Sequence, residues 1–117
     1  MDLSIPILIC EEREEIRNLI RDMLTKHGFF HLIEANSSEE VINLAAREKK
    51  HFLLIDKKLL DSSVKELLST RKRFLVIAQP EDQVTIELAS RYGVAHIISF
   101  PYSSKRLAEK IMQMAAQ

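Results

Sequence analysis

Glycine, cysteine and tryptophan are scarce in this 117-residue chain, which has two glycines, one cysteine and no tryptophan. Dinucleotide-binding loops and P-loops need closely spaced glycines, so neither motif is present. A single cysteine cannot form an internal disulfide, which favours a reducing compartment. No apolar run approaches the roughly 18 residues of a membrane span, and the first residues lack the basic region and cleavage site of a signal peptide. These absences predict a cytoplasmic protein that does not enter a membrane.

The charges of the chain balance, because 17 Lys and Arg residues oppose 17 Asp and Glu residues. A neutral chain has no overall attraction for nucleic acid or anionic lipid. The short basic cluster Arg71–Arg73 is interpreted as a solvated turn, since one cluster in a neutral domain is thin support for nucleic-acid binding. The length suits one domain over residues 1–117. We therefore expect a single domain that does not bind nucleic acid.

Five apolar runs alternate with amphipathic stretches along the chain. Four of the runs are almost continuously apolar, which is typical of strands covered on both faces in a parallel sheet. His31 and Glu34 interrupt the second run, which indicates an edge strand. The runs are Ile7–Cys10, Phe29–Ala35, Phe52–Ile55, Phe74–Ala78 and Ala95–Phe100.

Between these runs, apolar residues recur with the spacing of a helix. Gly28 and Gly93 are placed to end helices, the segment starting at Ser37 is a capping box, and Pro80 suits a first helical turn. The pattern predicts five βα units in an open, doubly wound α/β domain. The apolar stripes are Ile16, Leu19, Ile20, Met23 and Leu24; Val41, Leu44 and Ala45; Val64, Leu67 and Leu68; Val84, Leu88 and Ala89; and Leu107, Ala108, Ile111, Met114 and Ala115.

Acidic residues stand at the ends of two predicted strands. Glu11 and Glu12 follow the first strand, and Asp56 ends the third. Sites in such sheets form at the carboxyl ends of the strands, so the three carboxylates are expected in one small area. Carboxylates repel phosphate and flavin anions and attract a cation, typically Mg²⁺. The alternative is that Glu11 and Glu12 are acids favoured in the first turn of a helix. Asp56 argues against it, because an acid at the end of an apolar strand does not contribute to packing.

Several short motifs, none specific alone, occur together in a characteristic order and spacing. The chain resembles, over essentially its whole length, the receiver domains of two-component response regulators. The resemblance implies the flavodoxin-like receiver fold, a (βα)5 domain with a five-stranded parallel sheet of strand order 2-1-3-4-5. The motifs are Ile7–Arg17, Lys26–Phe29, Glu34–Glu40, Phe52–Asp56, Tyr92–Ala95 and Pro101–Ser103.

The resemblance implies a role for each residue at the strand ends. Asp56 occupies the position that accepts a phosphoryl group from a histidine kinase. Glu11 and Glu12 occupy the acidic pair that helps to bind Mg²⁺. Ala78 stands where the family keeps a Thr or Ser that follows the phosphate, and Phe100 stands where it keeps a near-invariant Lys.

These departures remove parts of the phosphorylation switch. Phosphoryl transfer depends on positioning and on charge stabilisation, and Phe100 supplies no cation while Ala78 supplies no hydroxyl. Ile97 stands where a switching aromatic is common. Glu side chains in the acidic pair add a methylene to each arm, and Mg²⁺ tolerates misplaced ligands poorly. One hypothesis is that Lys58 pairs with Asp56 or Glu12 as a replacement cation; the alternative is a solvated lysine.

The sequence therefore predicts an atypical receiver, or pseudo-receiver, that acts as a regulatory protein-interaction module with weak phosphorylation or none. Its expected contact surface spans Glu81 to Ala116, toward a partner, a neighbouring output domain or a second copy in a homodimer. The alternative is a genuine Mg²⁺-dependent receiver phosphorylated on Asp56. No enzyme activity beyond phosphoryl transfer to Asp56 is expected. No cofactor is expected either, with Mg²⁺ as the alternative at a weak or lost site of Glu11, Glu12 and Asp56.

Overall fold

The structure, a computed structural model that describes residues 3–79 and 82–116, contains five parallel strands, five α-helices and two short 3₁₀ helices within those ranges. In chain order they are β1 (Ile7–Cys10), α1 (Glu14–Lys26), β2 (Leu32–Ala35), α2 (Ser38–Arg47), β3 (Phe52–Asp56), η1 (Lys57–Leu59), α3 (Ser62–Ser69), β4 (Phe74–Ala78), α4 (Gln83–Tyr92), η2 (Val94–His96), β5 (Ile97–Ser99) and α5 (Ser104–Ala115).

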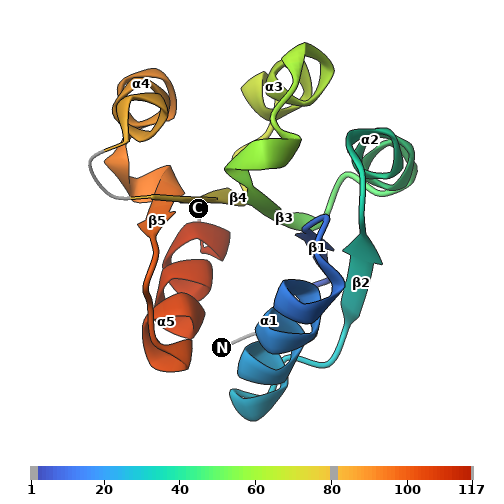
Figure 1. Ribbon diagram of the computed structural model, residues 1–117. Coiled ribbons are helices and arrows are strands. Elements are labelled where there is room, and N and C mark those ends of the chain that lie inside the picture. Colours follow the sequence, from blue (N-terminus) through green and yellow to red (C-terminus); the bar gives the residue numbers. More distant parts are fainter. Residues whose placement is uncertain (1–2, 80–81, 117) are drawn as a thin grey trace.

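The strands lie in the order β2-β1-β3-β4-β5, which confirms the predicted topology. Helices α1 and α5 cover one face of the sheet, and α2, α3 and α4 cover the other (Figure 1). Every residue of β1, β3 and β4 is buried, because these strands have neighbours on both sides and helices on both faces. Their continuous apolar sequences follow from this position.

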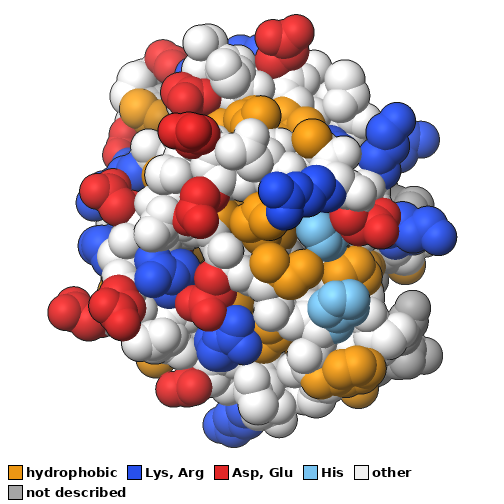
Figure 2. Space-filling view, turned by 90° about the vertical axis from the view of Figure 1, so that its right-hand side faces the viewer, with side chains coloured by type: hydrophobic (Ala, Val, Ile, Leu, Met, Phe, Trp, Pro, Cys, Tyr) orange, Lys and Arg blue, Asp and Glu red, His pale blue; other side chains and the backbone are white. Residues whose placement is uncertain are grey.

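Strand β2 forms one edge of the sheet and is only partly buried. The polar Glu34 within it had indicated an edge strand, and the structure confirms this. Figure 2 looks at the molecule from the side where β2 and α2 lie in Figure 1. On this face most acidic side chains gather toward the left margin, and two His side chains lie toward the right margin with several Lys and Arg side chains.

Alternate residues of each central strand enter two separate apolar cores. Ile9 and Leu54 belong to the core beneath α1 and α5, whereas Leu8 and Leu53 belong to the core beneath α2, α3 and α4. Successive side chains of a strand point to opposite faces, so apolar residues are needed at both alternating sets of positions; Asp56 at the end of β3 is the exception.

The second and fifth predicted strands are shorter in the structure. β2 begins at Leu32, because Phe29 packs into the core beneath α1 and α5 instead of pairing with a strand. β5 begins at Ile97, because the preceding residues Val94–His96 form η2. Continuous hydrophobicity does not separate a strand from an apolar turn that packs beside it.

The predicted apolar stripe of α4 is partly wrong. Val84 was expected to face the sheet, but it is 46% exposed, and Thr85 is buried in its place. The predicted Leu88 is buried, and Ala89 packs against the core beneath α2, α3 and α4. Asp82 caps the start of α4 by accepting a hydrogen bond from the Val84 backbone N–H. The predicted first-turn residue Pro80 lies outside the described residues.

The other helix boundaries follow local signals in the sequence. Gly28 and Gly93 have φ angles of 92° and 96°, which glycine adopts readily, and each ends a helix as predicted. Ser37 accepts a hydrogen bond from the Glu40 backbone N–H, and Ser103 accepts one from that of Arg106. Side-chain caps of this kind satisfy backbone donors that the helix leaves free.

Substitution Leu54→Ala is expected to lower the free energy of unfolding by about 2–5 kcal/mol, because it leaves a cavity in the central strand. Leu54 is fully buried, whereas Leu19 is 47% exposed. Leu19→Ala removes the same atoms and is expected to cost less than about 1 kcal/mol. Urea unfolding of both variants measures the difference, and equal losses would contradict the described core.

Candidate functional site

Pairing of β1 with β3 brings two carboxylates to one edge of the sheet. Cys10 lies opposite Ile55 in the parallel register, so the next residues, Glu11 and Asp56, stand side by side at the strand ends. Glu11 is 1% exposed and Asp56 is 7% exposed. Glu12 is exposed instead. The structure therefore buries two of the three predicted acids together.

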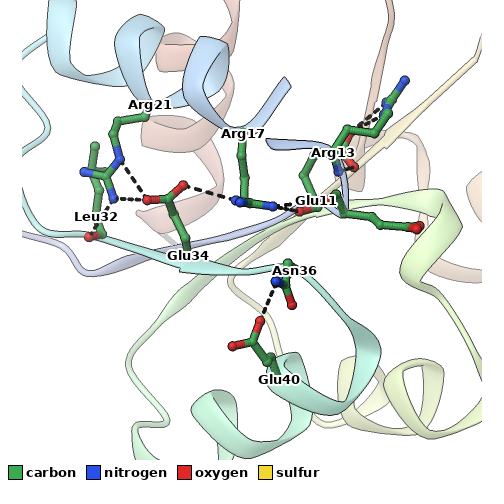
Figure 3. Close-up of polar contacts among 9 residues, drawn as sticks. Glu11, Arg13, Arg17, Arg21, Leu32, Glu34, Asn36 and Glu40 are labelled. Atoms are coloured by element: carbon green, nitrogen blue, oxygen red, sulfur yellow. Dashed lines mark hydrogen bonds and ion pairs between the residues drawn. The ribbon is translucent and has the colours of Figure 1, made fainter. Parts of the chain in front are cut away.

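Arg13 supplies the cation for this buried pair. Its Nε and Nη2 donate hydrogen bonds to Oε1 of Glu11 at 3.1 and 2.6 Å, and its backbone N–H donates to Oε2 at 3.2 Å. Nη2 also lies 3.9 Å from Oδ1 of Asp56. Figure 3 shows the Arg13 side chain turned back onto Glu11. One guanidinium therefore neutralises part of the charge of both acids.

Lys58 does not have the role suggested from the sequence. Its backbone N–H donates to Oδ2 of Asp56 at 3.0 Å, while its side chain is exposed. Among the described residues, the ion pair to Asp56 comes from Arg13. The cation beside Asp56 is therefore Arg13, which stands two residues after Glu11, and not Lys58, which stands two residues after Asp56.

The pKa of Asp56 is raised, mainly because burial disfavours its charged form. The hydrogen bond from the Lys58 backbone lowers this pKa, the charge of Glu11 raises it, and the charge of Arg13 lowers it. The same surroundings act on Tyr102, whose pKa rises to about 12 through burial and through the charges of Asp56 and Glu11. Burial is thus the main influence on both groups at this edge.

A cavity of about 160 Å³ opens beside Asp56. Glu11, Arg13 and Asp56 form its polar end, and residues of α1 and of the segment after β5 form an apolar wall. This wall includes Phe100, which is 48% exposed and meets Tyr102 edge-on with a centroid separation of 6.0 Å. The cavity is thus charged at its floor and apolar at its mouth.

No protein-family model matches the sequence, and no curated protein matches it. Solved structures do resemble it. FixJ-N superimposes with a TM-score of 0.80 at 20% identity, over 100% of this chain and 97% of FixJ-N. The receiver domain of a sensor histidine kinase from Pseudomonas aeruginosa was solved with a magnesium ion in its active-site cleft. It superimposes with a TM-score of 0.80 at 17% identity, over 97% of this chain and 99% of that domain. The fold is that of response-regulator receiver domains.

A third similar structure, NtrX from Brucella abortus, has a TM-score of 0.74 at 18% identity. The match covers 97% of this chain but 28% of NtrX, so in that protein the receiver fold is one part of a longer chain. Within the described residues of the present chain, no helix has the length and apolar character needed to cross a membrane.

Ala78 and Phe100 both line the cavity that contains Asp56. Ala78 ends β4 and is 3% exposed. A methyl group and an aromatic ring cannot donate hydrogen bonds to an anion. Besides Arg13, the cations that line this cavity are Lys57 and Lys58.

The residues at this edge do not fit a Mg²⁺ ion. Mg²⁺ needs oxygen ligands in near-octahedral geometry, and Oε1 of Glu11 is engaged by Arg13. Glu12 is exposed. No group of three His, Cys, Asp or Glu side chains able to hold a metal occurs within residues 3–79 and 82–116.

A network of arginines fixes the turn that carries the acidic pair. Arg17 donates from Nη1 to the carbonyl oxygens of Glu11 and Glu12 at 2.9 and 3.2 Å, and from Nε to Glu34 on β2 at 3.2 Å. Arg21 donates to Oε2 of Glu34 from Nε and Nη2 at 3.1 and 2.8 Å (Figure 3). The edge strand is thereby tied to the turn after β1.

The sequence contained a signal for this network that was missed. Arg17 and Arg21 are four residues apart and therefore lie on one face of a helix. Glu34 was interpreted only as a break in an apolar strand, but its carboxylate is the partner of both arginines. A polar residue in an edge strand can thus belong to the support of a site at the strand ends.

A second polar contact connects the segment after Asp56 with helix α4. The ammonium group of Lys57 bonds to Oδ2 of Asp82, and Oδ1 of Asp82 accepts the Val84 N–H. The bond from Lys57 is the main reason that the pKa of Asp82 is lowered. The start of α4 is therefore tied to the loop beside the cavity.

Substitution Asp56→Asn is expected to stabilise the protein at pH 7. A raised pKa means that the folded state binds the proton of Asp56 more tightly, so the wild type loses stability as the pH rises from about 3.8 through the folded-state pKa. The gain from Asp56→Asn should shrink as the pH falls and vanish below about 3.8, where the carboxyl is protonated in both states. Urea unfolding across this range measures it.

The control is Asp22→Asn, which makes the same change at an exposed position of α1. This variant is expected to show little gain at any pH. A loss of stability at pH 7 in Asp56→Asn would show that the ion pair with Arg13 outweighs the burial of the carboxylate.

Proposed function

We propose that the chain is a pseudo-receiver, a regulatory protein-interaction module that keeps the receiver fold and acts without a phosphorylation switch. The observation that carries this proposal is the hydrogen-bonded contact of Arg13 with Glu11, beside Asp56. The guanidinium stands among the carboxylates that would otherwise attract a metal. The cation of the site is therefore a side chain of the protein, and it is present whatever the concentration of metal ions.

The apolar groups around Asp56 support the same proposal. A phosphoryl group on Asp56 would need hydrogen-bond donors and positive charge around its oxygens. Phe100 and Ala78 present carbon atoms to the cavity, and the ammonium of Lys57 is already bonded to Asp82. A phosphorylated Asp56 would gain little from these neighbours.

The output of such a module is contact with a protein through the region Glu81 to Ala116. Glu81 lies outside the described residues. In the described part of this region, Val84, Ile86 and Val94 are 46%, 55% and 75% exposed. Exposed apolar side chains on α4 and η2 suit a contact with a partner, an output domain or a second copy.

A second candidate function is a genuine Mg²⁺-dependent phosphoacceptor receiver. The observation that favours it is the placement of Asp56 at the end of β3, on the floor of an open cavity. The Arg13 side chain is 50% exposed, so it has room to swing into solvent and free the oxygens of Glu11. One experiment separates the two candidates.

Incubation with Mg²⁺ and a small phosphodonor is expected to leave most of the protein without a phosphate mass increment. The physical reason is that Ala78 and Phe100 donate no hydrogen bond beside Asp56, while Arg13 is engaged by Glu11 and Lys57 by Asp82. Intact-protein mass spectrometry measures the increment, with Asp56→Asn as the matched control. A stoichiometric increment that disappears in Asp56→Asn would instead establish the second candidate.

Substitution Arg13→Ala is expected to strengthen Mg²⁺ binding by about tenfold or more, because it removes one positive charge and frees Glu11. Titration with MgCl₂, followed by the backbone amide signals of Asp56 and Lys58, measures the affinity. Arg47→Ala removes the same charge at the exposed end of α2 and should leave the affinity unchanged. Equal affinities of wild type and Arg13→Ala would show that Arg13 does not take the cation position.

A further inference from the structure

A second cavity lies at the opposite end of the strands, where β3 and β4 begin and α2 and α3 end. Its volume is about 580 Å³, within the roughly 300–1,000 Å³ of small-molecule sites. It is lined by four cations and no carboxylate, although the charges of the whole chain cancel. The lining residues are Ala46, Lys49, His51, Leu67, Thr70, Arg71, Lys72 and Arg73.

One of the four cations has a structural role at the end of α2. Arg71 donates from Nη2 to the carbonyl of Ala45 at 2.7 Å, and from Nη1 to those of Glu48 and Lys49 at 3.5 and 3.2 Å. The last carbonyls of a helix lack partners within the helix, so Arg71 satisfies them. The end of α3 is satisfied locally, because Thr70 donates from its N–H and its hydroxyl to the carbonyl of Leu67.

The other three cations are not used by the fold. Within the described residues, the side chains of Lys49, Lys72 and Arg73 make no hydrogen bond and no ion pair. None of the three bonds to a helix-end carbonyl in the described part of the chain, so they do not cap α2 or α3. Three like charges around one hollow repel one another, and a bound anion would relieve that repulsion.

His51 adds an unsatisfied polar group to the wall of this cavity. The residue is 7% exposed, and its Nδ1 is buried without a hydrogen-bond partner in the described structure. Burial lowers the pKa of His51, the carboxylate of Glu48 raises it, and the charges of Arg71 and His31 lower it. The lowered pKa favours the neutral form of the ring, mainly because the ring is buried.

We propose that this cavity binds a small molecule that carries a multiply charged phosphate group. Three unpaired cations match a phosphate chain better than a single carboxylate, and the Arg73 guanidinium is suited to contact two phosphate oxygens at once. Ala46, Leu67 and the His51 ring provide an apolar wall for an organic part. This proposal revises the interpretation of Arg71–Arg73 as a solvated turn, and it does not depend on the state of Asp56.

The test is a calorimetric titration of the whole chain with sodium pyrophosphate and, separately, with ADP. Saturable binding at one site is expected, weaker at higher NaCl concentration because the contacts are electrostatic. The double substitution Lys72→Gln and Arg73→Gln should weaken binding by about tenfold or more. If ADP binds more tightly than pyrophosphate, the apolar wall also contacts the ligand. If the two bind equally, the phosphates alone are recognised. Either result supports the site.

The matched control is the double substitution Lys105→Gln and Arg106→Gln, which removes the same charge from exposed positions of α5. It should bind pyrophosphate like the wild type. Equal weakening by both double variants, or no saturable binding of either probe, would overturn the proposal. Binding of a short RNA or DNA oligonucleotide more tightly than of both probes would also overturn it, in favour of a nucleic-acid surface.

A second measurement separates binding from damage to the fold. The side chains of Lys72 and Arg73 contact no described residue by hydrogen bond or ion pair, so their removal should leave urea unfolding unchanged. On addition of pyrophosphate, the NMR signals of the His51 ring should shift and its pKa should rise, because an anion stabilises the protonated ring. Calorimetric heat without a change at His51 would place the anion elsewhere and contradict the proposal.

Discussion

The parallel pairing of β1 with β3 is the constraint on which the site depends. It places Glu11 and Asp56 side by side at the ends of two buried strands, where their charges repel and water is largely excluded. Two buried carboxylates are stable together only with a cation or a proton. Arg13 provides the cation, while burial keeps the pKa of Asp56 raised. The arginine network around Glu34 then fixes the turn that holds this arrangement.

The same topology gives the two ends of the sheet different sets of charges. In a βα repeat, each helix begins near the end of the preceding strand and ends near the start of the next. At one end, carboxylates and cations line the same cavity. At the other end, where α2 and α3 finish, Lys49, Arg71, Lys72 and Arg73 line a cavity without a carboxylate. Helix dipoles favour bases at helix ends, so these cations also stabilise α2 and α3.

Much of the fold could be predicted because its signals are local. The continuous apolar runs of β1, β3 and β4, the glycine at position 93 and the Ser37 cap act through neighbouring residues, and all are confirmed. The errors arose where packing overrides pattern. Phe29 is apolar because it fills the core, not because it pairs in a sheet, and Val84 is exposed because α4 turns Thr85 inward.

The sequence by itself determined the five βα units and the positions of Asp56, Ala78 and Phe100 at the strand ends, because chain order and parallel pairing leave few alternatives. Only the tertiary structure decided which cation meets the acids. Arg13 and Lys58 both stand close to an acid in sequence, but the Arg13 guanidinium turns back onto Glu11 and lies near Asp56, whereas the Lys58 side chain is exposed. The structure likewise placed His51 and Arg73 around one cavity, since residues from two separate βα units converge only after the sheet has formed.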